Sequence, residues 1–320
     1  MGVAAVVVLA LIGAGSVVTF FAGPPGVGHF TSAAGRAAYV GAYDEAMGLL
    51  PDPATTRDVP TSFGTVRVYE WAADPDGDTE VPPLVLMPGR ASGAPMWAQN
   101  LPHLLGSRRI IVFDLLGDAG LSTQTVPMRN TADAALWMDE LFAEIAPEGV
   151  HLVGHSFGGA YAMAYALAHP ERIHSLALLE PVFTFAAPPA DLLAWTVVSS
   201  LPLLPDPWRE HALSRVGGAD YDPTDPIAQM VQAGTQHYSA DLPQPQVLTS
   251  DQISAVQVPV YVALGDRDSL AGGEAAEKAA SELPNGTVEV WSDSTHSLPM
   301  QNVREIGQHL LTFAAQHDPL

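Results

Sequence analysis

The chain has 320 residues, no cysteine, and a formal net charge of −22 that arises from 13 Lys and Arg against 35 Asp and Glu. The lack of cysteine excludes disulfides, a thiolate nucleophile and cysteine-ligated metal. The acidic balance argues against nucleic acid as a partner, because phosphate binding needs a basic surface. Hydrophobic residues make up 48% and charged residues 15%, which is typical of a globular domain joined to an apolar segment.

An uncharged apolar segment covers residues 3–22. Roughly 20 such residues can span a bilayer as a helix. A secretory signal peptide usually has a basic start and a cleavage site of small residues, and neither is evident here. We therefore expect residues 1–23 to anchor the protein in a membrane, with a cleaved signal peptide of an exported protein or a buried helix as alternatives. The orientation stays open, because the first positive charge is Arg36.

Strand and helix patterns follow a linker and packing helix that we expect over residues 24–60. Residues 64–71 alternate polar and apolar positions, as an antiparallel edge strand does. Mostly apolar runs then alternate with helical patterns, which predicts an α/β fold with a mostly parallel central sheet flanked by helices. The expected strands are 84–87, 109–113, 151–153, 173–179, 258–264 and 287–291, and the expected helices are 97–105, 130–145, 158–168, 273–282 and 303–315.

The alternation is interrupted over residues 181–256, which are rich in Pro, Leu, Trp and Asp. We predict a helical cap here, inserted between core halves at 61–180 and 257–320. An apolar cap suits an apolar substrate pocket, although an insertion that only stabilises the fold is an alternative. Asp220, Asp222 and Asp225 could together hold Ca²⁺, but their Asp-Pro turns favour a solvated loop.

Residues 150–161 predict a serine nucleophile. An apolar run ends in Gly154-His155-Ser156-Phe157-Gly158, and an Ala-rich helical pattern follows. A strand, a sharp turn with a serine at its apex and a helix form a nucleophile elbow. The alternative is a glycine-rich turn that contains a serine by chance.

A serine hydroxyl needs a base, and a base histidine needs an acceptor for its second ring nitrogen. Among eleven histidines, His296 stands out because its loop follows the last predicted strand and meets the sheet edge where Ser156 lies. For the acceptor we favour Asp268, in the loop after residues 258–264, over Asp266 and Glu180. No metal site is expected.

Two backbone N–H groups are candidates for stabilising a developing oxyanion. One belongs to Phe157, which directly follows the nucleophile. The other belongs to Arg90, in the glycine-containing loop after residues 84–87.

From about residue 32 to 313, the chain resembles the serine α/β-hydrolase superfamily, and bacterial carboxylesterases and lipases within it. The similarity rests on residues 88–90 with 96–97, 112–122, 154–159, 265–268 and 295–296. Pro88 departs from the His-Gly that is common in the first motif, so the histidine that usually supports this loop is missing.

This resemblance implies a serine hydrolase that cleaves carboxylic esters through an acyl-enzyme intermediate. The triad would be Ser156, Asp268 and His296, without metal or organic cofactor, and the substrate a small, apolar ester. Two alternatives remain. One is another serine-triad reaction on a lactone, amide or carbon–carbon bond, and the other is a catalytically silent fold that serves as a binding module.

Overall fold

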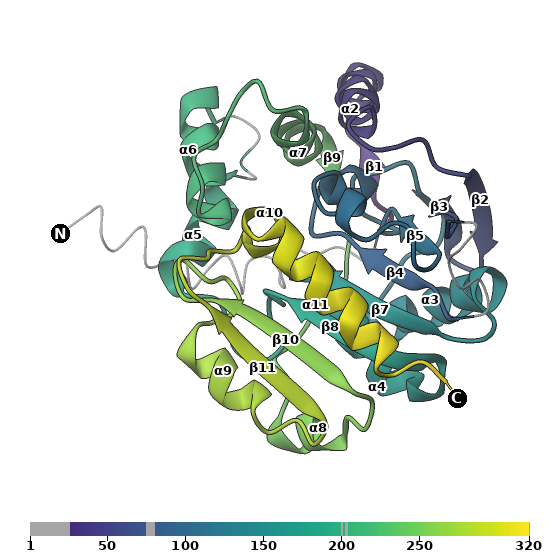
Figure 1. Ribbon diagram of the computed structural model, residues 1–320. Helices are drawn as coiled ribbons and strands as arrows, with labels where there is room; N and C mark the ends of the chain where they lie inside the picture. The colour runs from purple at the N-terminus through teal and green to yellow at the C-terminus, as the bar shows by residue number, and fades with distance from the viewer. Residues whose placement is uncertain (1–25, 75–80, 200, 202–203, 320) are drawn as a thin grey trace.

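The computed structural model describes residues 26–74, 81–199, 201 and 204–319. Within them, a nine-stranded sheet has the order β11-β10-β8-β7-β4-β5-β3-β2, with β6 paired to β3 (Figure 1). The strands are β2 (Thr55–Thr61), β3 (Gly64–Trp71), β4 (Leu84–Met87), β5 (Ile110–Phe113), β6 (Thr123–Gln124), β7 (Val150–His155), β8 (Ile173–Leu179), β10 (Val260–Gly265) and β11 (Gly286–Trp291).

The strands from β5 to β11 in this order are parallel, while β2 and β3 are antiparallel to their neighbours. Every residue of β4, β5, β7 and β10 is buried, as expected for parallel strands covered on both faces. The predicted α/β fold is confirmed.

The expectation that residues 64–71 form an edge strand is wrong, because β2 lies outside β3 and pairs with it along its length. The sequence of β2 does not show a strand pattern. Only Val59 of its seven residues is buried, so the strand lacks a regular apolar alternation. Pro60 is compatible with this position, since proline is tolerated in edge strands.

Helices cover both faces of the sheet (Figure 1). One face packs on α3 (Thr131–Ile145), α4 (Ser156–Ala168), α8 (Ser250–Ala255) and α9 (Glu274–Ala280). The other packs on α2 (Ala33–Met47) and α11 (Val303–Ala315).

The helix predicted over residues 97–105 is replaced by two 3₁₀ turns, η1 (Ala94–Trp97) and η2 (Leu101–His103). Pro102 explains the difference, because a proline lacks the N–H of a helical hydrogen bond and its ring collides with the preceding turn.

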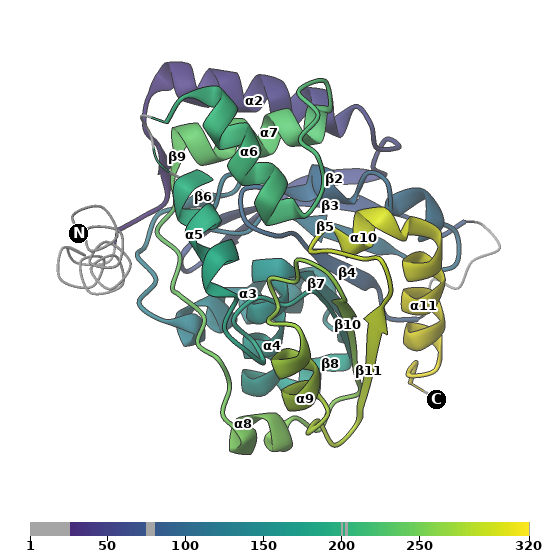
Figure 2. The same ribbon diagram turned by 90° about the vertical axis from the view of Figure 1, so that its left-hand side faces the viewer.

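Between β8 and β10 the chain forms α5 (Ala190–Ser199), α6 (Asp206–Gly217), α7 (Pro226–His237), the short strand β9 (Tyr238–Ser239) and α8. The strand β9 pairs with β1 (His29–Phe30), and α7 packs against α2. Figure 2 shows α2, α6 and α7 grouped at one end of the molecule. The first described residues of the chain are therefore joined to this insertion.

The membrane anchor predicted for residues 1–23 lies outside the described residues. Among the residues that are described, no helix is both long enough and apolar enough to cross a bilayer.

Candidate active site

Ser156 lies at a sharp turn between β7 and α4, as the elbow motif predicts. It has a φ of +54°, a left-handed conformation that is strained for a residue with a side chain. The turn can form only because its neighbours are glycines. A Cβ on Gly154 would lie 2.6 Å from the Cα of Gly159, and one on Gly158 would lie 2.3 Å from the carbonyl oxygen of Pro88. The backbone thus fixes the serine at the carboxyl edge of the sheet.

His296 follows β11 and precedes α10 (Leu298–Gln301). Its Nε2 lies 2.9 Å from the Oγ of Ser156, and its Nδ1 lies 3.1 Å from the Oε2 of Glu180. Because an ionised carboxylate can only accept a hydrogen bond, Nδ1 carries the proton and Nε2 is free to accept from the serine hydroxyl. The structure therefore brings together Ser156 and His296, two of the residues predicted from the sequence.

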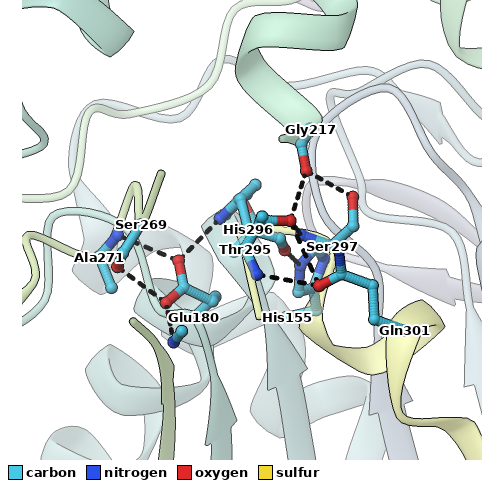
Figure 3. A network of polar contacts seen from close by, with 11 residues as sticks. His155, Glu180, Gly217, Ser269, Ala271, Thr295, His296, Ser297 and Gln301 are labelled. Carbon is cyan, nitrogen blue, oxygen red and sulfur yellow. Dashed lines mark hydrogen bonds and ion pairs between the residues drawn. The ribbon is translucent and has the colours of Figure 1, made fainter. Parts of the chain in front are cut away.

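The prediction of Asp268 as the histidine's partner is wrong. Its side chain is 39% exposed and lies 3.7 Å from the guanidinium of Arg215. Asp266 is also directed elsewhere, since its carboxylate accepts from the backbone N–H of Ser294 at 3.2 Å. Glu180, the least favoured of the three candidates, occupies the position instead (Figure 3).

The carboxylate of Glu180 is completely buried. Its Oε1 accepts from the N–H of Gly265 at 2.7 Å and from the hydroxyl of Ser269 at 2.8 Å, and its Oε2 accepts from the N–H of Ala271 at 3.4 Å. The loop after β10 thus supplies donors that hold the acid, where we expected it to supply the acid itself. The geometry follows from the sheet order, because β8 lies between β7 and β10.

The loop after β4 packs against the nucleophile. A Cβ on Gly89 would lie 3.3 Å from the Cβ of Ser156, so the backbone passes directly over the serine. The guanidinium of Arg90 lies 5.6 Å from the ring centre of Phe157. The two residues proposed to supply oxyanion donors are therefore neighbours, while the donor roles of their N–H groups stay predictions.

Two buried carboxylates hold this loop, a role that the sequence analysis did not assign. Asp118 accepts from the N–H of Ala91 at 2.8 Å. Asp114 accepts from the N–H of Ala94 at 2.7 Å and from the Tyr43 hydroxyl at 3.0 Å. Burial raises the pKa of Asp114 to about 6, although these hydrogen bonds oppose the shift. The carboxylates anchor the loop that here begins with Pro88 in place of the family's histidine.

His155 connects the elbow to the histidine loop. Its Nε2 lies 3.0 Å from the carbonyl oxygen of His296, to which it donates. Burial, assisted by the nearby His296 ring, lowers the pKa of His155 to about 3. The ring is therefore neutral near pH 7 and adds no positive charge beside His296.

Among the described residues, no group of three His, Asp or Glu side chains is arranged to hold a metal ion. In the acidic loop, Asp222 accepts from the backbone N–H and the hydroxyl of Thr224. Asp225 accepts from the N–H of Ile227 at the start of α7. These two carboxylates thus accept hydrogen bonds within their own loop and at the start of α7.

A model of the Alpha/beta hydrolase family matches residues 84–306, well over half of the chain. The chain belongs to this family. The resemblance that the motifs carry is thereby confirmed. The curated relatives include Carboxylesterase YbfK of Bacillus subtilis (strain 168), which is 24% identical over 280 residues that cover 85% of this chain and 92% of the relative. An uncharacterized carboxylesterase, nap, of the same organism is 26% identical over 284 residues, with 86% and 91% covered.

Solved structures of other proteins share the fold. The naproxen esterase (carboxylesterase NP) of Bacillus subtilis aligns with a TM-score of 0.78 at 24% identity, over 87% of this chain and 98% of that one. A membrane phospholipase A described as a bacterial virulence factor aligns with a TM-score of 0.59 at 18% identity, over 99% of both chains.

Proposed function

We propose that this α/β-hydrolase is a serine carboxylesterase in which Ser156 is the nucleophile, His296 the general base and Glu180 the acid that orients the histidine. The continuous hydrogen-bonded series from Ser156 to His296 to Glu180 carries this proposal. Serine hydrolases are recognised by such geometry and not by the position of the acid in the chain. The curated carboxylesterase relatives support ester hydrolysis as the reaction.

The reaction begins when the Oγ of Ser156 attacks the ester carbonyl carbon and its proton passes to the Nε2 of His296. The tetrahedral intermediate collapses as His296 returns this proton to the leaving alcohol, which leaves an acyl group on Ser156. Water then loses a proton to His296 and attacks the acyl carbonyl. The collapse of the second intermediate releases the carboxylic acid and restores the serine hydroxyl.

Glu180 is suited to the imidazolium that forms twice in each cycle. A buried carboxylate is costly unless hydrogen bonds satisfy it, and here the donors from the loop after β10 do so before any positive charge appears. The negative charge is therefore fixed next to Nδ1. It both selects the productive tautomer and stabilises the protonated ring.

The N–H groups of Phe157 and Arg90 are proposed to receive the oxyanion. Phe157 lies in the first turn of α4, where unpaired N–H groups and the helix dipole favour negative charge. Arg90 lies in the loop that packs on Ser156. Donors held in place before the reaction stabilise the transition state without a reorganisation cost.

We also propose that residues 1–23 anchor the protein in a membrane, on the strength of the uncharged run at residues 3–22. A charged side chain at the centre of a spanning helix costs about 2.5–3.5 kcal/mol on an insertion scale. Val7→Asp combined with Leu11→Arg should therefore shift the full chain from the carbonate-resistant membrane fraction to the supernatant. An unchanged distribution would contradict the anchor.

Fluorophosphonate labelling tests the nucleophile. The wild-type chain should be labelled and should hydrolyse p-nitrophenyl esters, with the acyl series from acetate to octanoate revealing the preferred chain length. Ser156→Ala should lose both properties while it keeps the circular dichroism spectrum of the wild type. Ser281→Ala is the matched control, because it removes an exposed hydroxyl that bonds only the carbonyl of Glu277. Labelling that persists in Ser156→Ala would refute the assignment.

A further inference from the structure

We propose that the last turn of α6 positions His296, so that the insertion between β8 and β10 forms part of the catalytic alignment. This inference rests on the proposed function, because it assigns the support of its base. One atom carries it. The carbonyl oxygen of Gly217 accepts from the Thr295 hydroxyl at 3.0 Å and from the Ser297 hydroxyl at 2.7 Å (Figure 3).

The sequence explains why this oxygen is available. The last four carbonyl groups of a helix have no partner within the helix, and Gly217 is the final residue of α6. Thr295 and Ser297 directly precede and follow His296. Their two hydroxyls therefore satisfy the orphan carbonyl and at the same time fasten the backbone on both sides of the histidine to one point.

The contact is close as well as polar. Gly218 caps α6 with a φ of +68°, and a Cβ there would lie only 2.4 Å from the Cβ of Thr295. Gln301 of α10 adds a further contact, because its Oε1 accepts from the N–H of Thr295 at 2.9 Å and lies 3.3 Å from the Thr295 hydroxyl. Thr295 is thus held between the end of α6 and α10, and its main chain has little freedom to shift.

This attachment joins two separate parts of the chain. Helix α6 belongs to the insertion between β8 and β10 and packs on α5, whereas the histidine loop belongs to the sheet after β11. An exposed ion pair between Arg215 and Asp268 also links the two parts, but exposed pairs contribute little, typically about 0–1 kcal/mol. The two partly buried hydroxyl contacts with Gly217 are therefore the connection through which the insertion sets the position of His296.

The expected consequence is a loss of turnover and not of substrate binding. The Nε2 of His296 must stay within hydrogen-bond reach of Ser156, now 2.9 Å away, and a misplacement of about 1 Å can cost up to roughly 100-fold in rate. Neither Thr295 nor Ser297 contacts the reacting atoms in this arrangement, so both are positioning residues.

The test compares Thr295→Val/Ser297→Ala with Thr295→Ser in the full chain. The double variant should lose about tenfold in kcat and in the rate of fluorophosphonate labelling, with KM within about twofold. Thr295→Ser keeps the hydroxyl and should keep kcat within about twofold. Ser281→Ala serves as the control for the removal of a hydroxyl that lies on α9's C-terminal side and bonds only Glu277. If the double variant does not fold, each single variant is measured in its place.

A second readout does not depend on turnover. The proton on the Nδ1 of His296, which faces Glu180, should give a low-field ¹H NMR signal in the wild type and in Thr295→Ser. It should be broadened or absent in the double variant. Wild-type kcat in the double variant, an equal loss in Thr295→Ser, or an unchanged proton signal would overturn the inference. A wild type that is neither labelled nor active would instead refute the proposed function, and the NMR comparison would still decide the inference.

Discussion

The carboxylate of Glu180 lies 3.1 Å from the Nδ1 of His296, although the two residues are 116 positions apart in the chain. One follows β8 and the other follows β11, on opposite sides of β10. The acid therefore reaches the histidine across the end of the strand between them, and that strand's own loop supplies the N–H of Gly265 as a donor.

This relationship predicts different outcomes for two carboxylates. Glu180→Gln should lower kcat by about 10²- to 10⁴-fold, because an amide no longer selects the tautomer or stabilises the imidazolium. Asp268→Asn should keep kcat within about threefold, since the exposed carboxylate contacts only Arg215. Steady-state kinetics on one p-nitrophenyl ester distinguishes the two. A larger loss in Asp268→Asn than in Glu180→Gln would restore the assignment made from the sequence.

Ser156 and His296 could be predicted from the sequence because each is marked by the order of the elements directly around it. A strand, a turn of glycines and a helix are readable around the serine, and the histidine follows the last strand of the pattern. The acid depends instead on which loop reaches across the sheet edge, and both Asp268 and Glu180 follow apolar strands. One signal did favour Glu180. It directly follows the four apolar residues 176–179, where a carboxylate is buried and requires a partner.

The strands also differed in how readily the sequence predicted them. Strands that are buried on both faces are rich in apolar residues and were predicted, whereas β2 has one buried residue, Val59, and was not predicted. The support for the loop at Arg90 comes from Asp114 and Asp118, whose contacts join residues 20 and 27 positions apart. The spacing of residues along the chain does not predict contacts of this kind.

Asp118 should matter for turnover although it lies away from the triad. Its Oδ2 accepts from the N–H of Ala91 and its Oδ1 from the N–H of Ala119, and an amide cannot accept at both atoms. Asp118→Asn should leave one buried N–H without an acceptor, loosen the loop after β4 and lower kcat by about tenfold. Asp222→Asn, which alters an exposed turn, is the control for loss of a carboxylate. Equal kcat in the two variants would show that turnover does not depend on the support that Asp118 gives to the loop after β4.

The stability of the protein should fall in acid partly because of His155. Burial lowers its pKa to about 3, against 6.5 for the exposed side chain. Below pH 6.5 the His155 ring is protonated in the unfolded chain but stays neutral in the folded chain. Its contribution to the free energy of unfolding is therefore fully present above pH 6.5 and is lost as the pH falls toward 3. His155→Gln removes the titrating group. The urea midpoint of this variant should change less between pH 7 and pH 4.5 than that of the wild type.

The control for this pH effect is His29→Gln, because His29 is exposed and its ring contacts only the nearby carbonyl of Val27. This variant should follow the wild-type curve. A His155→Gln curve that is as steep as the wild type would show that other groups account for the acid loss.

Arg90 should act through its backbone, and its side chain should be dispensable for turnover. The side chain is 51% exposed, lies 4.0 Å from Asp118 and stands over the ring of Phe157. Contacts of this kind at exposed sites contribute about 0.5–1 kcal/mol. Arg90→Ala keeps the N–H and should keep kcat within about threefold.

Arg90→Pro removes that N–H and should reduce kcat by about 10²- to 10³-fold, the typical effect of losing one oxyanion donor. Because proline also restricts the preceding residue, the loss counts only if Arg90→Pro retains the wild-type melting temperature to within a few degrees. Should Arg90→Ala instead lose as much kcat as Arg90→Pro, the guanidinium would be the functional group, and the second oxyanion donor would have to be sought elsewhere in the loop after β4.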